Sequence, residues 1–378
     1  MQIYLVGGAV RDQLLHYPVY DKDWVVVGAT PDAMLAKGFK PVGKDFPVFI
    51  HPGSGEEYAL ARTERKSGKG YTGFQYFAAP DVTLEEDLQR RDLTINAIAQ
   101  SADGTLIDPY HGQQDIEQRI LRHVSPAFAE DPLRVLRVAR FAARYHHLGF
   151  RVAEETLTLM QTLSESDELN HLVAERVWKE SERAFNETSP YTYIELLKRC
   201  GALSVLFPEW LSLFDNASIQ SETESVLSRL KQQSGQGIAV FSCLMTLATR
   251  QLPPEQAHLQ ITRFCERLRT PKLWLEQALQ VQRWHSEISR FAALNGRQRF
   301  EIIQALDLLR RPQRLAGILI CCQALHNTDD SPATLFFPLL ERLNQLEASA
   351  LIAEGFKGKA LGDELNRRRQ QLCCEPEG

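Results

Sequence analysis

The alternation of apolar and polar positions divides the chain into two parts with different periodicity. Near the amino terminus, short runs rich in β-branched and aromatic residues are separated by glycine and proline, the pattern of strands joined by turns. These runs are IYLV at 3–6, DWVVVG at 23–28, PVFI at 47–50 and EEYALA at 56–61. From about Leu84 onward, apolar residues recur three and four positions apart, first in 84–99 and then in 131–145. The pattern predicts an α+β part followed by an almost entirely helical remainder.

Changes in this pattern suggest boundaries between regions. We expect a head with a mixed or antiparallel sheet at 1–115, a helical neck at 116–200, a helical body at 201–325 and a helical tail at 326–378. The polar stretch from Asn216 to Gln236 is predicted to be a loop within the helical part. Gly358 precedes a predicted final helix that carries Arg367, Arg368 and Arg369.

Composition narrows the class of protein. The chain has 378 residues, 44% of them hydrophobic, which suffices for more than one core. No apolar run approaches the roughly 20 residues that cross a bilayer, and the start MQIYLVGGAVRD resembles a strand and not a leader, so a cytoplasmic protein is expected. The seven cysteines form no C-x-x-C pair, so reduced thiols are expected. Because the net charge is −5, a nucleic-acid partner would need a local basic patch.

Two acidic residues near the amino terminus carry the first candidate chemistry. Asp21 and Asp23 are two apart at the start of a predicted strand, so both carboxylates project from one face and can share metal ions. Transfer of a nucleotide requires divalent ions about 3.5–4 Å apart. Just upstream, Gly7 and Gly8 lie between a strand and a predicted helix, where bare backbone N–H groups and Arg11 can reach phosphate oxygens.

Each of these signals alone has a plainer explanation, because Gly-Gly is often just a turn and D-x-D is often a solvated strand end. Together they resemble the polymerase-β-like nucleotidyltransferases. The similarity extends to bacterial CCA-adding enzymes of class II and covers at least residues 1–200. It runs through LVGGAVRD, DKDWVVVG, EEYALARTERKSG, RRDLTINAIA and EDPLRVLRVARF. The resemblance implies template-independent addition and repair of the 3′-terminal CCA of tRNA from CTP and ATP, with Mg²⁺ as cofactor and pyrophosphate as product.

The run 130–140 is predicted to be a helix with an acidic residue at its start and a proline in its first turn. Asp131 and Arg134 are then neighbours on one surface and present an acceptor beside a donor fork. Cytosine and adenine both place an exocyclic amino group next to an unprotonated ring nitrogen, so one such pair can accept both bases. Uracil and guanine would leave buried polar groups unpaired. The alternative is an ordinary salt-bridged helix face.

In the resemblance this helix is the protein template for the base, and Arg137 and Arg140 are further nucleotide-contacting arginines. An α-helix drifts by about 60° with each i+3 step. Arg137 and Arg140 are therefore assigned to phosphate or sugar contacts, or to bracing the head. The resemblance also implies that Arg91 contacts the triphosphate and that Asn96 contacts the ribose, while Asp92 is expected to orient arginines.

Three further segments bear on function. Glu57 is either a third acidic group beside the aspartates or a water-facing edge-strand glutamate. Residues 62–81, with Gly68, Gly70 and Gly73, have the composition of a mobile loop, whose retention implies full CCA addition in the resemblance. The tail from Gly355 onward either holds the tRNA elbow, as in the family, or is a solvated basic helix.

The carboxyl-terminal half contains no His-Asp dipeptide, so we expect it to lack the phosphohydrolase domain of some bacterial relatives. His258, His285 and His326 are interpreted as isolated helix residues. The alternatives are an enzyme that adds only CC or only A, a bacterial poly(A) polymerase, or a non-catalytic RNA-binding protein. No oligomeric state is indicated.

Overall fold

The computed structural model describes residues 1–42, 48–66, 74–77, 79–233, 235–328 and 332–374, and the chain divides into two compact units, Met1–Pro208 and Glu209–Gly378. Within the described residues no helix has both the length and the apolar character needed to cross a bilayer. The seven cysteines, all of which are described, form no disulfide.

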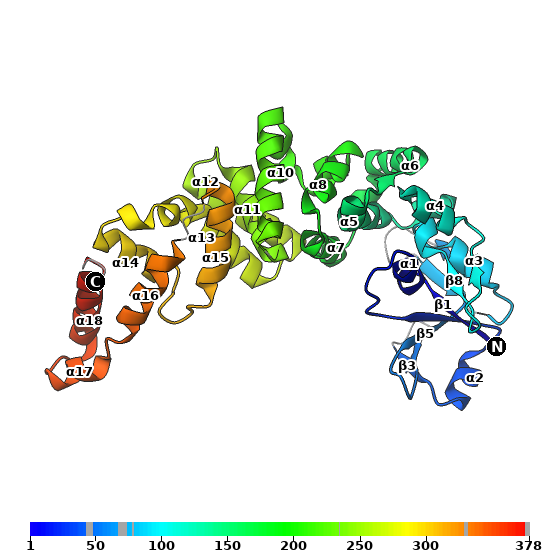
Figure 1. The fold of residues 1–378 in the computed structure, drawn as a ribbon, viewed down its shortest axis with the longest axis horizontal. Coiled ribbons are helices and arrows are strands. Elements are labelled where there is room, and N and C mark those ends of the chain that lie inside the picture. The colour runs from blue at the N-terminus through cyan, green and yellow to red at the C-terminus, as the bar shows by residue number, and fades with distance from the viewer. Residues whose placement is uncertain (43–47, 67–73, 78, 234, 329–331, 375–378) are drawn as a thin grey trace. The chain divides into compact units, whose positions relative to one another are not determined.

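A mixed sheet forms the amino-terminal part of the first unit (Figure 1). In the described residues its order is β3-β4-β5-β2-β1-β8-β9. Only β2 and β5 pair in parallel. The strands are β1 (Gln2–Val6), β2 (Asp23–Val27), β3 (Lys40–Val42), β4 (Val48–Ile50), β5 (Glu57–Leu60), β8 (Ala99–Gln100) and β9 (Leu106–Ile107). The expected α+β head is thus confirmed.

Both faces of this sheet are covered, because successive side chains of β2 point in opposite directions. Val25 packs with Val6 and Leu88 on one face, whereas Val26 packs with Met34 and Phe49 on the other. The helices of this region are α1 (Gly8–Leu14), α2 (Pro31–Ala36), α3 (Leu84–Gln89) and α4 (Gly112–Gln118). The central strand β2 is thereby fixed between two cores, and its first residue is Asp23.

The helical periodicity predicted over 84–99 holds for one short helix only. Thr83 caps α3 with a reciprocal capping box, and the helix ends at Gln89. The carboxylate of Asp92 then accepts from the backbone N–H of Leu93, which draws the chain out of helical geometry. A 3₁₀ turn (Thr94–Asn96) follows, and Ala99 pairs with Val6 as part of β8. The buried apolar residues of this stretch therefore belong to a turn and a strand.

The predicted loop at 62–81 contains a hairpin of β6 (Thr63–Lys66) and β7 (Phe74–Phe77), paired antiparallel. Its three glycines, Gly68, Gly70 and Gly73, lie outside the described residues.

Helices complete the first unit. They are α5 (Arg134–Tyr145), α6 (Glu154–Glu165), α7 (Ala174–Asn186), α8 (Pro190–Arg199) and α9 (Ala202–Leu206), and the short parallel strands β10 (Ile120–Leu121) and β11 (Arg151–Val152) lie among them. The central helix α5 packs against α7 and α8 (Figure 1). Most of α5 is buried, including Arg134 and Arg140.

The second unit is helical, as predicted. Its helices are α10 (Ala217–Gln232), α11 (Gly237–Thr249), α12 (Pro254–Leu268), α13 (Lys272–Ser289), α14 (Gly296–Ala305), α15 (Arg314–His326), α16 (Ala333–Asn344), α17 (Ala348–Ala353) and α18 (Gly358–Leu372). The loop predicted at 216–236 is wrong, because most of it forms α10. Asn216 caps that helix, and Thr223, Val226, Leu227 and Leu230 form its buried stripe.

Candidate active site

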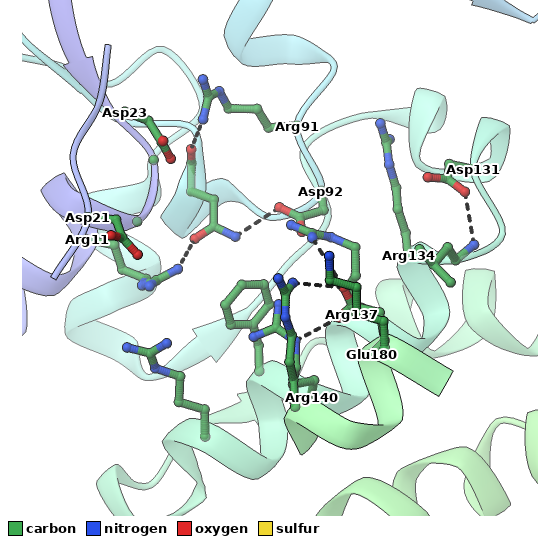
Figure 2. A pocket seen from close by; sticks show the side chains of 18 of the residues that line it. Arg11, Asp21, Asp23, Arg91, Asp92, Asp131, Arg134, Arg137, Arg140 and Glu180 are labelled. Atoms are coloured by element: carbon green, nitrogen blue, oxygen red, sulfur yellow. Dashed lines mark hydrogen bonds and ion pairs between the residues drawn. The ribbon is translucent and has the colours of Figure 1, made fainter. Parts of the chain in front are cut away.

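A cavity of about 950 Å³ opens in the first unit, and charged side chains from four segments line it (Figure 2). The turn from β1 into α1 and the approach to β2 contribute its acidic side. The segment after α3, the helix α5 and the helix α7 contribute most of its cations. All ten residues predicted as site residues line this cavity: Gly8, Arg11, Asp21, Asp23, Arg91, Asn96, Asp131, Arg134, Arg137 and Arg140.

Asp21 and Asp23 lie on the same side of the cavity, close to Arg11 and Arg91 (Figure 2). Within the described residues, neither carboxylate accepts a hydrogen bond. Removal of surrounding water raises the pKa of Asp23, Arg91 lowers it, and the negative charge of Asp21 raises it further, so the pKa lies above its ordinary value. Two acidic groups that disfavour each other's charge and lack donors are suited to a cation.

Glu57 is the neighbour of Asp23 across the parallel strands β2 and β5, but its side chain is exposed and does not line the cavity. It also does not lie on an edge strand, because β5 is flanked by β4 and β2. The described part of the chain contains no group of three or more acidic, histidine or cysteine side chains that could hold a metal ion. The two aspartates are therefore the available acidic pair.

A glycine is required where the chain leaves β1. Gly7 has φ of +69°, and a Cβ atom there would lie 2.7 Å from Nη1 of Arg91. The neighbouring Gly8 lines the cavity but meets only an ordinary contact with Arg11 at 3.5 Å. Gly7 thus lets Arg91 extend across the turn, where its guanidinium also bonds to Asp87 at 3.3 Å.

A chain of hydrogen bonds crosses the cavity floor (Figure 2). Nη1 of Arg11 donates to Oδ1 of Asn96 at 2.5 Å, and Nδ2 of Asn96 donates to Oδ1 of Asp92 at 2.9 Å. Nε of Arg137 donates to Oδ2 of Asp92 at 2.8 Å. Burial alone would raise the pKa of Asp92, but Arg137 and Asn96 outweigh it and hold the pKa far below its ordinary value. Asp92 thus orients an arginine, as expected, and is fully engaged by protein donors.

The predicted geometry of Asp131 and Arg134 is wrong in one respect. Helix α5 begins at Arg134, and Asp131 precedes it in extended conformation, so the two residues do not share a helical turn. Arg134 donates to the carbonyl oxygens of Ala127 and Arg90 at 2.8 and 2.5 Å. Asp131 instead accepts from Arg176 at 3.0 Å. Local backbone bonding by Asp131 to the N–H of Leu133 explains the later helix start.

Helix α7 supplies functional candidates that the sequence interpretation omits. Arg176, Lys179, Glu180, Arg183 and Glu187 line the cavity. Glu180 accepts from Nε of Arg140 at 2.7 Å, and both side chains are less than 10% exposed. The recurrence of charges at 176, 179, 180, 183 and 187 is the spacing of one helix face, a signal that was available in the sequence.

Two predictions for the second unit also need correction or qualification. His285 and His326 are not isolated, because their rings stack and Nδ1 of His285 lies 2.9 Å from Nε2 of His326. The final helix does carry its arginines, but Arg367 and Arg368 both pair with Glu364, and Arg368 also pairs with Glu354. The positive charge of α18 is therefore largely offset.

Comparison with known proteins places these features in a family. Residues 3–122 match the poly A polymerase head domain, and residues 149–213 match a family described as a probable RNA and SrmB-binding site of polymerase A. The chain is similar to the multifunctional CCA protein of Teredinibacter turnerae, with 48% identity and coverage of 98% of this chain and 97% of that protein. The corresponding protein of Pseudomonas fluorescens is 50% identical, with the same coverage.

Solved structures show the same fold at lower identity. A Bacillus stearothermophilus CCA-adding enzyme in complex with CTP has a TM-score of 0.70 and 23% identity, covering 98% of this chain and 88% of the other. A Thermotoga maritima CCA-adding enzyme complexed with tRNA has a TM-score of 0.68 and 21% identity, covering 100% and 88%.

The head, the acidic pair at the start of β2 and the arginine-lined cavity define a nucleotidyltransferase with a poly A polymerase head. Identity of about half over nearly the whole length then fixes the family. The chain belongs to the multifunctional CCA proteins.

Proposed function

We propose that this protein adds and repairs the 3′-terminal CCA of tRNA without a nucleic-acid template. CMP and AMP are transferred from CTP and ATP, the 3′-hydroxyl of the RNA attacks the α-phosphate, and pyrophosphate leaves. The observation that carries this proposal is one cavity holding two aspartates without hydrogen-bond donors, in the described residues, on one side and Asp131 with Arg134 on the other. Family membership supports the same reaction. These substrates imply action in the cytoplasm.

Asp21 and Asp23 are the proposed ligands of Mg²⁺. Their oxygens are hard donors at the cavity surface, and Mg²⁺ commonly uses one or two carboxylates together with waters and substrate phosphates. The ion, when bound, supplies a lower pKa for the RNA hydroxyl and offsets charge on the phosphates. The raised pKa of Asp23 fits this role, because a nearby cation would relieve the repulsion from Asp21.

Arg91 and Arg11 lie beside this acidic pair and are the proposed triphosphate contacts, with the backbone at Gly8 close by. Asn96 is the proposed ribose contact. Its amide already bridges Arg11 and Asp92, so a hydroxyl bound there would be placed relative to both arginine and acidic side chains. Arg140 braces α5 against Glu180, whereas Arg137, with 33% of its side chain exposed, can also meet a sugar or phosphate.

Asp131 and Arg134 are the proposed readers of the base. Each oxygen of a carboxylate has two lone pairs, so Asp131 can accept an amino hydrogen of cytosine or adenine while it remains bonded to Arg176. A guanidinium has five N–H donors, more than the two carbonyl groups of Ala127 and Arg90 require. Arg134 can therefore donate to a ring nitrogen. Uracil and guanine would reverse both contacts and be rejected.

An incorporation assay tests the function. Purified protein is incubated with tRNA lacking its 3′ end and with each labelled nucleoside triphosphate in turn. The expected product gains two C residues and then one A, with no incorporation from UTP or GTP. Unlimited extension with ATP would identify a poly(A) polymerase, and termination after CC or acceptance of A alone would identify a partial enzyme. Tight RNA binding without any incorporation would identify a non-catalytic RNA-binding protein.

A further inference from the structure

Tyr20 is displayed at the cavity in an unusual way. Its side chain is 81% exposed, more than any other large hydrophobic side chain in the described residues, the next being Leu273 at 58%. It nevertheless lines the same cavity as the two aspartates and directly precedes Asp21. A large aromatic side chain left exposed at the opening of a charged cavity marks a ligand contact.

The segment that carries Tyr20 is held at both ends. Tyr17 donates its backbone N–H to the carbonyl of Asp12 at 2.8 Å, and its ring meets the ring of Tyr145 edge-on, with centroids 6.0 Å apart. At the other end, Asp23 enters the sheet opposite Val6. The short link between these anchors limits the conformational freedom of Tyr20, so a contact with its ring costs little ordering entropy.

We propose that Tyr20 is a stacking platform for a base at the 3′ end of the RNA substrate. This inference rests on the proposed function. The RNA hydroxyl must approach Asp21 and Asp23, so its own base arrives on the same side of the cavity as Tyr20. Figure 2 shows Asp131 on the opposite side, where the incoming base is proposed to bind.

Stacking also suits a substrate whose terminal base changes at each step. Before successive additions, the RNA ends first in its own last nucleotide, then in one C and then in two. Hydrogen bonds to a base edge would favour one of these ends, whereas every base offers a π face to an aromatic ring. A tyrosine can therefore hold each successive end without reading its sequence.

Steady-state kinetics with substitutions at Tyr20 test the proposal. Tyr20→Leu keeps apolar surface but removes the ring, and we expect KM for the RNA to rise roughly tenfold with KM for CTP unchanged. Tyr20→Phe keeps the ring and should restore KM for the RNA to within about twofold of wild type. Leu35→Ala, which shortens an exposed side chain of α2, is the control for surface changes in the head. A rise in KM for CTP alone, or no effect of Tyr20→Leu, would overturn the proposal.

Binding measured without catalysis separates this inference from the proposed function. RNA that ends in 2-aminopurine should lose fluorescence on binding to wild type and to Tyr20→Phe, because stacking quenches the base, and should retain it with Tyr20→Leu. Equal quenching by Tyr20→Leu and wild type would refute stacking even if CMP incorporation is normal. Conversely, wild-type protein that incorporates no nucleotide yet shows ring-dependent quenching would refute only the proposed reaction.

Discussion

The two units of the chain use charged side chains in opposite ways. In Met1–Pro208, arginines and carboxylates meet inside the protein, and the pair Arg140–Glu180 is almost completely buried. In Glu209–Gly378, pairs such as Arg310–Asp307 follow exposed helix surfaces. Burying charges is costly unless each is well partnered, so evolution retains them mainly where their positions are needed. The comparison teaches that the position of an arginine, and not the number of arginines, indicates the site.

The largest expected difference between the units concerns catalysis. Asp21→Asn removes one negative charge from the cavity with little change in volume and should reduce CMP and AMP incorporation at least about 1,000-fold, because the cation loses a ligand. The matched substitution Asp307→Asn in the second unit should leave the rate unchanged, since Asp307 pairs only with surface arginines in the items of structure described. Single-turnover incorporation measures both, and a normal rate for Asp21→Asn would exclude the metal assignment.

Stability should distinguish the same two environments. Glu180→Ala leaves Arg140 buried with only the more distant Glu187 at 3.5 Å, so we expect a loss of about 3 kcal/mol in the free energy of unfolding. Glu364→Ala breaks solvent-exposed pairs with Arg367 and Arg368 and should have little effect. Urea unfolding curves compare the variants. Equal destabilisation by the two substitutions would show that burial does not govern these pairs.

A histidine pair reverses the comparison, because here the second unit has the buried polar contact. Burial and His326 lower the pKa of His285 to about 4 despite the opposing charge of Glu287, and burial together with Arg290 lowers the pKa of His326. The unfolded state therefore binds more protons below the ordinary pKa of 6.5, and stability should fall as pH drops from about 6.5 towards 4.

We expect this loss to be on the order of 1–2 kcal/mol. Replacing His285 with Gln should remove it, so that unfolding curves of wild type and His285→Gln differ in their pH dependence between pH 7 and pH 4.5. Parallel pH profiles would mean that the pair does not titrate in this range.

The smallest expected difference concerns RNA binding. Lys179 and Arg183 line the cavity, whereas Arg367 and Arg368 in α18 are offset by Glu354 and Glu364. The double substitution Lys179→Ala with Arg183→Ala should weaken tRNA binding several-fold and lower the salt dependence by one to two phosphate contacts, about 0.7–0.9 in slope for each.

The double substitution Arg367→Ala with Arg368→Ala should change this salt dependence less. Filter binding across a range of salt concentrations compares the two variants. A larger effect of the α18 variant would assign the RNA grip to the tail, as the family resemblance implies.

Much of the head could be predicted from sequence, because strand alternation and turn residues are local signals. The runs at 3–6 and 23–28 appear as β1 and β2, and the D-x-D spacing placed Asp21 and Asp23 correctly in one cavity. Local signals failed where they compete. The polar composition of 216–236 concealed the buried stripe of α10, and side-chain bonding by Asp92 ended a helical pattern early.

The sequence by itself determined which chemical groups were available and which element carried each of them: two aspartates at the start of a strand, arginines on a helix and glycines at a turn. Only the tertiary structure decided their partners. Arg134 bonds to carbonyl groups far away in sequence, Asp131 bonds to Arg176, and His285 meets His326. The physical reason is range, because periodicity and turn propensity act over a few residues, whereas ion pairs and burial depend on which distant elements pack together.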